Sequence, residues 1–139
     1  MAVIEGIVKG STQGRILVVD DDAGIRQLVG TILGEEGFEV EQAVDGVDAL
    51  AKMATQAYDV VVCDLQMPRL DGLSLLREIR RRGIKVPVII QTARVDASIE
   101  VVLHRAGAIR VLSKGPMEEL LQSVGDVVGS SRHPTESGR

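Results

Sequence analysis

The sequence has almost no aromatic residues. Its 139 residues include one phenylalanine, one tyrosine and no tryptophan. A site for single-stranded nucleic acid needs aromatic side chains on which bases stack, so the composition excludes a site of that kind. The core is therefore expected to consist of aliphatic side chains and methionine.

Cysteine is equally scarce. The single cysteine, Cys63, lies in the apolar run 60–63. One thiol cannot form an intramolecular disulfide or supply a cluster of soft metal ligands, so we expect neither a disulfide framework nor a thiolate metal centre. We interpret Cys63 as a small buried core residue.

Long hydrophobic runs and a strong charge of one sign are also absent. The apolar runs have the length of a strand, and the first residues lack the features of a secretory signal. The net charge is -4, with basic and acidic residues interspersed. We therefore expect a cytoplasmic protein that binds neither a membrane nor nucleic acid directly.

From residue 15 onward, short runs of β-branched residues alternate with longer stretches of helical periodicity. This alternation is typical of a parallel sheet built from βα units. It predicts five strands, at residues 15–20, 38–42, 59–63, 86–91 and 108–112. The central runs are almost continuously apolar, as expected for strands that helices cover on both faces.

The segments after these strands carry apolar residues at spacings of three and four, which predicts five amphipathic helices. We expect each apolar stripe to face the sheet. The stripes consist of Ile25, Leu28, Val29, Ile32 and Leu33; of Val47, Leu50 and Met53; of Leu73, Leu75, Leu76 and Ile79; of Ile99, Val102 and Leu103; and of Leu120, Leu121, Val124 and Val128.

The chain has room for one domain. We expect an N-terminal extension at residues 1–14, the folded domain at residues 15–128 and a disordered tail at residues 129–139, which are small and polar. No output module fits in this tail, so we expect the domain to act without an attached effector domain.

Acidic side chains follow the first and third predicted strands. The first strand ends in Asp20, Asp21 and Asp22, and the third is followed by Asp64. In an open parallel sheet of order 2-1-3-4-5, ligands bind outside the carboxyl ends of the strands, where the order switches between strands 1 and 3. We therefore expect Asp20, Asp21 and Asp64 to meet there, whereas Asp22 is better interpreted as a helix N-cap.

Carboxylates that meet at this point repel each other by about 4 kcal/mol per pair at about 4 Å and an effective dielectric constant near 20. A hard, partly hydrated cation that binds phosphoryl oxygens offsets this repulsion, and Mg²⁺ fits best. Lys114, after the fifth strand, supplies a second positive charge. Asp64 can then attack an activated phosphorus, and Thr92 can donate a hydrogen bond to a phosphoryl oxygen.

Four segments, in this order and spacing, resemble the response-regulator receiver family of two-component signalling. They are residues 16–22, the pattern Asp-x-x-Met-Pro-x-x-Asp-Gly at residues 64–72, Thr92-Ala93 and Lys114. The resemblance covers residues 15–128. It implies a flavodoxin-like fold, a five-stranded parallel sheet of order 2-1-3-4-5 with five helices distributed over both faces.

The resemblance also implies a role for each residue of the acid pocket. Asp64 would be the phosphoacceptor and a ligand of Mg²⁺, and Asp21 a direct ligand. Asp20 would bind the metal directly or through water, and the backbone carbonyl of Gln66 would complete the protein ligands. Gln66 and Arg94 occupy the positions at which the family adjusts hydrolysis of the acyl phosphate.

The partners follow from the same resemblance. A histidine kinase or a histidine phosphotransfer protein would donate the phosphoryl group, and the domain would catalyse its own phosphorylation and dephosphorylation without being an enzyme. As in chemotaxis-type single-domain receivers, the signal would pass to a protein target through the face formed by the fourth helix, fifth strand and fifth helix. We expect a monomer or a weak dimer.

The sequence departs from the family at two places. Receivers usually carry proline directly after the lysine, whereas this chain reads Lys114-Gly115-Pro116, and the added glycine is expected to aim the lysine less well. Pro116 then suits the start of the fifth helix. Val111 replaces the usual aromatic residue of the fifth strand. These departures leave open an alternative, a receiver-like protein-interaction module that is not phosphorylated.

Two further functions fit the residues poorly. A phosphohydrolase acting on small molecules would need a second carboxylate two residues after the nucleophile, where Gln66 stands. A flavin carrier would need a phosphate-binding loop after the first strand, where three aspartates would repel a phosphate.

Overall fold

The computed structural model describes residues 13–132 of the chain. The strands are β1 (Arg15–Val19), β2 (Glu39–Ala43), β3 (Val60–Asp64), β4 (Val88–Thr92) and β5 (Arg110–Ser113). The helices are α1 (Ala23–Glu35), α2 (Gly46–Thr55), α3 (Gly72–Arg81), α4 (Ala97–Ala106) and α5 (Met117–Arg132). All strands are parallel, in the order β2-β1-β3-β4-β5, which confirms the predicted flavodoxin-like architecture.

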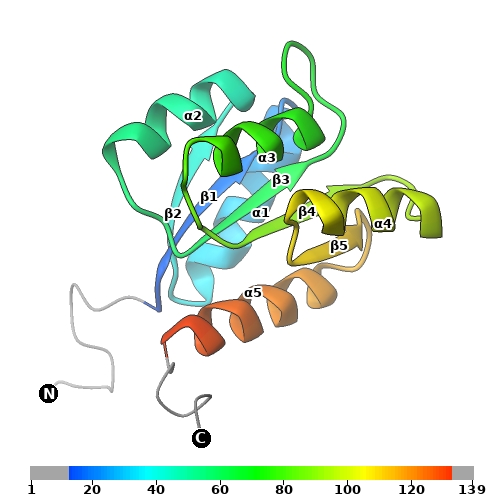
Figure 1. Ribbon diagram of the computed structural model, residues 1–139. Coiled ribbons are helices and arrows are strands. Elements are labelled where there is room, and N and C mark those ends of the chain that lie inside the picture. Colours follow the sequence, from blue (N-terminus) through cyan, green and yellow to red (C-terminus); the bar gives the residue numbers. More distant parts are fainter. Residues whose placement is uncertain (1–12, 133–139) are drawn as a thin grey trace, which may run out of the picture.

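The two faces of the sheet carry separate cores. Helices α1 and α5 cover one face and α2, α3 and α4 the other (Figure 1). Side chains alternate between the faces along each strand, so Ile16 and Val18 point toward α1 and α5, and Leu17 and Val19 toward the other three helices. Cys63 is fully buried on the second face, as predicted.

Four strands begin one or two residues later than predicted, and four end one residue later. The prediction followed apolar runs, which mark burial, whereas the strand bounds follow backbone pairing. In β3, β4 and β5 the pairing includes the polar residue after the apolar run, so that Asp64 lies opposite Gln91 and Thr92 opposite Ser113. The ladder therefore fixes the backbone of Asp64 and Thr92 directly.

Aspartates begin four of the helices. In each case the side chain accepts a hydrogen bond from the backbone N–H three residues later, which satisfies a donor that the helix leaves free. These N-caps are Asp22, Asp45, Asp71 and Asp96. The predicted capping role of Asp22 is confirmed, and α5 begins directly after Pro116, as expected.

The predicted apolar stripes are too wide. Ile25, Leu28, Val47 and Val102 are 37%, 50%, 49% and 39% exposed, so the expectation that they face the sheet is wrong. Each helix forms an outer layer, and only the part of its stripe directly over the sheet is covered. Side chains at the margins of the stripe remain in contact with solvent.

The C-terminal helix is longer than predicted. Helix α5 continues to Arg132, four residues beyond the boundary expected at residue 128, and it ends shortly before Pro134, which disfavours a helical residue ahead of it. Residues 1–12 and 133–139, which hold most of the predicted extension and tail, lie outside the described residues. Within residues 13–132, every helix is too short or too polar to cross a bilayer.

Candidate functional site: an acid pocket at the carboxyl edge of the sheet

Three carboxylates converge where β1 and β3 end. One oxygen each from Asp20, Asp21 and Asp64 lies within 4.8 Å of the others. Asp20 and Asp64 are 4% and 8% exposed, whereas Asp21 is exposed to solvent. The structure thus brings together the three aspartates that the sequence placed at this edge, two of them buried.

Backbone hydrogen bonds hold Asp20 in place. Its Oδ1 accepts a bond from the backbone N–H of Asp22 (2.9 Å), and its own N–H donates to the carbonyl of Ala43 in β2 (3.3 Å). The guanidinium of Arg26 donates to the carbonyl oxygen of Asp20 (2.8 Å). The N–H of Asp22 therefore fixes the buried carboxylate, while β2 and α1 fix the backbone of Asp20.

Asp64 is fixed by its strand and by the loop that follows. The N–H of Leu65 donates to the carbonyl of Gln91 in β4 (2.8 Å), which extends the ladder past the end of β3. The N–H of Gln66 donates to Asp64 Oδ1 (3.3 Å), which leaves Oδ2 facing Lys114. The loop therefore orients the Asp64 carboxylate directly, through the N–H of Gln66.

Lys114 reaches both buried carboxylates. Its Nζ lies 3.2 Å from Asp20 Oδ2 and 3.2 Å from Asp64 Oδ2, and its backbone N–H donates to the carbonyl of Thr92 (3.0 Å). Gly115 therefore does not prevent Lys114 from reaching both carboxylates. The extra residue falls after Lys114, and the backbone bond to β4 fixes the lysine before the chain turns.

Burial and charge shift the protonation of this site in defined directions. Burial raises the pKa of the Asp64 carboxyl above its usual value, and Asp20 adds to the rise while Lys114 opposes it. Burial tends to lower the pKa of Lys114, but Asp20 and Asp64 outweigh it, so the pKa of the lysine is raised. One ammonium group therefore does not fully compensate the carboxylates.

We expect Asp64→Asn to stabilise the protein in the absence of divalent cations by about 1 kcal/mol at neutral pH. Because the pKa of Asp64 is higher in the folded than in the unfolded chain, the free energy of unfolding of the wild type falls as pH rises from about 3.9 through the raised value. The difference in free energy of unfolding between Asp64→Asn and the wild type should therefore be absent in acid and fully developed at neutral pH. Urea titrations in chelator across this range measure it, and parallel pH profiles of the two proteins would contradict it.

Thr92 is buried at the end of β4, beside the pocket. Its hydroxyl lies within hydrogen-bonding distance of both the carbonyl and the N–H of Arg94, at 3.3 and 3.4 Å, and so contacts the β4–α4 loop. Gln66 and the side chain of Arg94 are exposed. Val111 is buried in the core beneath α4, so an aliphatic residue fills the place of the usual aromatic one.

Sequence reasoning missed an ion pair next to the pocket. Arg69, in the β3–α3 loop, donates to Oδ2 of Asp45, which is nearly buried at the start of α2. The aspartate before a helical stretch predicts an N-cap. No sequence signal connects it with an arginine 24 residues away.

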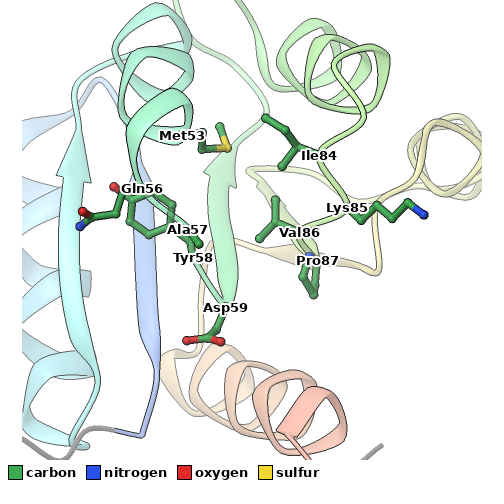
Figure 2. Close-up of a pocket in the computed structure, with 9 residues that line it drawn as sticks. All are labelled: Met53, Gln56, Ala57, Tyr58, Asp59, Ile84, Lys85, Val86 and Pro87. Carbon is green, nitrogen blue, oxygen red and sulfur yellow. The ribbon is translucent and has the colours of Figure 1, made fainter.

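A second pocket lies at the opposite edge of the sheet. This cavity of about 470 Å³ lies between α2 and the chain leading into β4. In Figure 2, Met53, Ile84 and Val86 point toward one another, whereas Lys85 points away to solvent. Asp59 is engaged by the backbone N–H of Arg15 (2.7 Å). The polar groups that line this second pocket do not converge on one point. The acid pocket is therefore the candidate site.

The sequence model of the response regulator receiver domain matches residues 16–125. This chain belongs to that family. The receiver domain is 45% identical over 108 residues to the response regulator MprA of a Mycobacterium species (strain KMS), an alignment that covers 77% of this chain and 47% of that protein. The chain thus spans about half the length of the mycobacterial relatives that it matches.

Solved receiver structures have the same fold. The receiver domain of Francisella response regulator 1452 superposes with a TM-score of 0.82 at 35% identity, covering 85% of this chain and 98% of that one. The Vibrio cholerae chemotaxis protein CheY4 gives 0.79 at 32% identity, covering 84% and 99%. Response regulator TrrA of Thermotoga maritima, solved in complex with Mg²⁺-BeF, gives 0.74 at 35% identity, covering 81% and 97%.

Proposed function

We propose that this receiver domain is a phosphoacceptor switch that accepts a phosphoryl group on Asp64 in the presence of Mg²⁺. The observation that carries the proposal is the clustering of Asp20, Asp21 and Asp64 within 4.8 Å at the end of β1 and β3, with Lys114 touching two of them. A cytoplasmic location is part of this proposal.

The donor set fits Mg²⁺. The three side chains offer oxygen atoms alone, and two of the carboxylates are buried together, which favours a hard cation between them. Asp20, Asp21, Asp64 and the carbonyl of Gln66 would hold the ion. When bound, it supplies positive charge to the oxygens of the transferring phosphoryl group.

Asp64, Lys114 and Thr92 each have a different role in the proposed phosphoryl transfer. A carboxylate oxygen of Asp64 attacks phosphorus and forms a P–O bond, while the P–N bond of a phosphohistidine breaks and the imidazole keeps the electron pair. Lys114 neutralises charge on the phosphoryl oxygens, and the Thr92 hydroxyl, turning from Arg94, donates to one of them. Attack of water on the acyl phosphate, with release of inorganic phosphate, resets Asp64.

A protein donor is supported by apolar surface beside the pocket. Ile25 and Leu28 on α1 are exposed, and they line a cavity of about 170 Å³ together with Lys114 and Pro116. A histidine kinase or histidine phosphotransfer protein that delivers a phosphoryl group to Asp64 can bury this surface. A small-molecule donor could react at Asp64 without burying this apolar surface.

The proposed output surface is the face made by α4, β5 and α5. Val101 and Val102 on α4 and Ile109 before β5 are 48%, 39% and 41% exposed, although all three are aliphatic. Phosphorylation adds about two negative charges next to Thr92, which ends β4 ahead of α4, and Lys114, which lies between β5 and α5. A protein target is the proposed partner of this face.

The test is phosphoryl labelling. The whole chain is incubated with Mg²⁺ and acetyl phosphate, and intact mass is measured for wild type, Asp64→Asn and Asp96→Asn. Asp96 is the exposed N-cap of α4, and asparagine caps a helix as well as aspartate does, so this variant is a matched control. We expect one added phosphoryl mass on wild type and Asp96→Asn and none on Asp64→Asn.

The other outcomes are equally informative. Labelling of none of the three proteins would favour the alternative, an interaction module that is not phosphorylated. Equal labelling of wild type and Asp64→Asn would remove Asp64 from its proposed role.

A further inference from the structure

The loop between β3 and α3, residues 65–71, contains an unusual turn next to the pocket. The N–H of Leu70 donates to the carbonyl of Pro68 (2.7 Å), two residues earlier, and Arg69 between them has a φ of 69°. Among residues 13–132, Arg69 is the one non-glycine residue with positive φ. A γ-turn with positive φ is rare and strained, so other contacts have to hold it.

Two contacts with the start of α2 hold this turn. The Arg69 guanidinium donates to Oδ2 of Asp45, whose Oδ1 accepts the N–H of Asp48 (2.8 Å), so both carboxylate oxygens are used. Leu70 packs on Gly46, where an added Cβ would lie 2.9 Å from the leucine Cδ2. The turn is thus fixed at Arg69 and at Leu70.

The same loop positions a group of the acid pocket. Its two ends are joined by the bond from Gly72 N–H to the carbonyl of Leu65 (2.7 Å), and Gln66 N–H donates to Asp64 Oδ1 (3.3 Å). Gln66 lies between this closure and the strained turn. A change of the turn therefore changes the direction of the peptide groups around Gln66.

We propose that Asp45 and Arg69 are positioning residues for the metal and phosphoryl site. Their ion pair holds the strained turn, and the turn aims the Gln66 carbonyl at the acid pocket. The inference rests on the proposed function, because it assigns these residues a role in binding Mg²⁺, although neither touches the ion.

The test compares Mg²⁺ affinity in variants that break the pair without removing the helix cap. Asp45→Asn keeps an N-cap but loses the charge, Arg69→Gln loses the guanidinium, and the double variant loses both. Mg²⁺ dissociation constants are measured on the whole chain by NMR titration of backbone amides. We expect each variant to bind Mg²⁺ about 5 to 10 times more weakly, because groups that orient metal ligands contribute about tenfold or more.

The sign of the Arg69→Gln effect separates positioning from simple charge. Removing a positive charge near a cation site strengthens cation binding by electrostatics alone, whereas removing the negative charge of Asp45 weakens it. Positioning predicts weaker binding in both variants and no further loss in the double variant. It also predicts a shifted Gln66 amide signal in both variants before Mg²⁺ is added.

Arg15→Gln is the matched control, because it breaks the Arg15–Glu39 ion pair (3.1 Å) at the other edge of the sheet and should leave the Mg²⁺ affinity unchanged within twofold. Tighter binding by Arg69→Gln, or unchanged binding by both variants, would overturn the positioning role and leave phosphorylation of Asp64 untouched. Failure of the wild type to bind Mg²⁺ would overturn the proposed function and this inference together.

Discussion

Replacing Gly72 with alanine is expected to abolish phosphoryl labelling and to lower the free energy of unfolding by about 3 kcal/mol or more. A Cβ at this position would lie 2.6 Å from the carbonyl oxygen of Asp64 and 2.8 Å from Cα of Leu65. Both are backbone atoms of the strand end that carries the candidate phosphoacceptor. Since no side-chain rotation relieves the clash, α3 has to move away from β3 and pull the loop with it.

Gly125→Ala is the control for this substitution. Gly125 lies in α5 with nothing within 4 Å of an added Cβ, so alanine there is expected to stabilise the protein by about 0.5–1 kcal/mol through helix propensity. Urea unfolding and labelling with acetyl phosphate measure both effects. Normal labelling of Gly72→Ala, with stability equal to that of the wild type, would show that the contact between α3 and β3 is not needed.

Replacing Arg80 with methionine is expected to cost about 3 kcal/mol of stability, because it removes the donor from three partly buried carbonyls. The guanidinium of Arg80 donates to the carbonyls of Ile84 (3.0 Å), Val86 (2.8 Å) and Gly107 (2.9 Å). It thereby joins the end of α3, the chain entering β4 and the end of α4. No carboxylate within the described residues pairs with it, and burial lowers its pKa.

Two variants test the geometry of this contact. Arg80→Lys keeps the charge but cannot reach three carbonyls with one ammonium group, so it should recover only part of the loss. Arg77→Met changes an exposed arginine of the same helix and should alter the stability by less than about 0.5 kcal/mol. Thermal and urea unfolding provide the measurement, and equal stabilities of Arg80→Met and Arg77→Met would refute the role of the three hydrogen bonds.

The fold was predictable because burial and hydrogen bonding agree along most of the chain. The runs around Val61 and Ile89 are apolar on both faces and flanked by helical periods, so the strands were located within two residues. The errors in the prediction arise where a residue has the hydrogen bonding of its helix but not the burial that the apolar pattern predicts. Ile25 and Val47 continue a helical stripe in sequence, but nothing in the part of the chain that the structure describes covers them on the outer side of α1 and α2.

The acid pocket was predictable for a topological reason. In a parallel sheet every strand ends at the same edge, so residues that follow different strands meet without any detail of side-chain packing. Asp20, Asp64 and Lys114 needed only the strand order to be brought together, and the structure places them in contact. Their chemical roles remain predictions, which the labelling experiment addresses.

The contacts that hold the pocket were not predictable in this way. The Asp45–Arg69 pair, the approach of Gly72 to Asp64 and the three bonds of Arg80 depend on how loops and helix ends pack, not on strand order. Gly72 carried a signal, since Asp-Gly before an apolar stripe predicts a turn and a cap. The sequence does not say that the glycine lies against the backbone of another strand.

Helix α4 differs from its neighbours in how little of it is enclosed. Leu103 is its one fully buried side chain, and Val101 and Val102 face outward. Local opening of an element costs free energy in proportion to the contacts it breaks, so this helix can shift or fray while the strands keep their pairing. The domain therefore combines a rigid sheet, which holds the carboxylates, with a weakly packed helix whose position can change the surface that another molecule contacts.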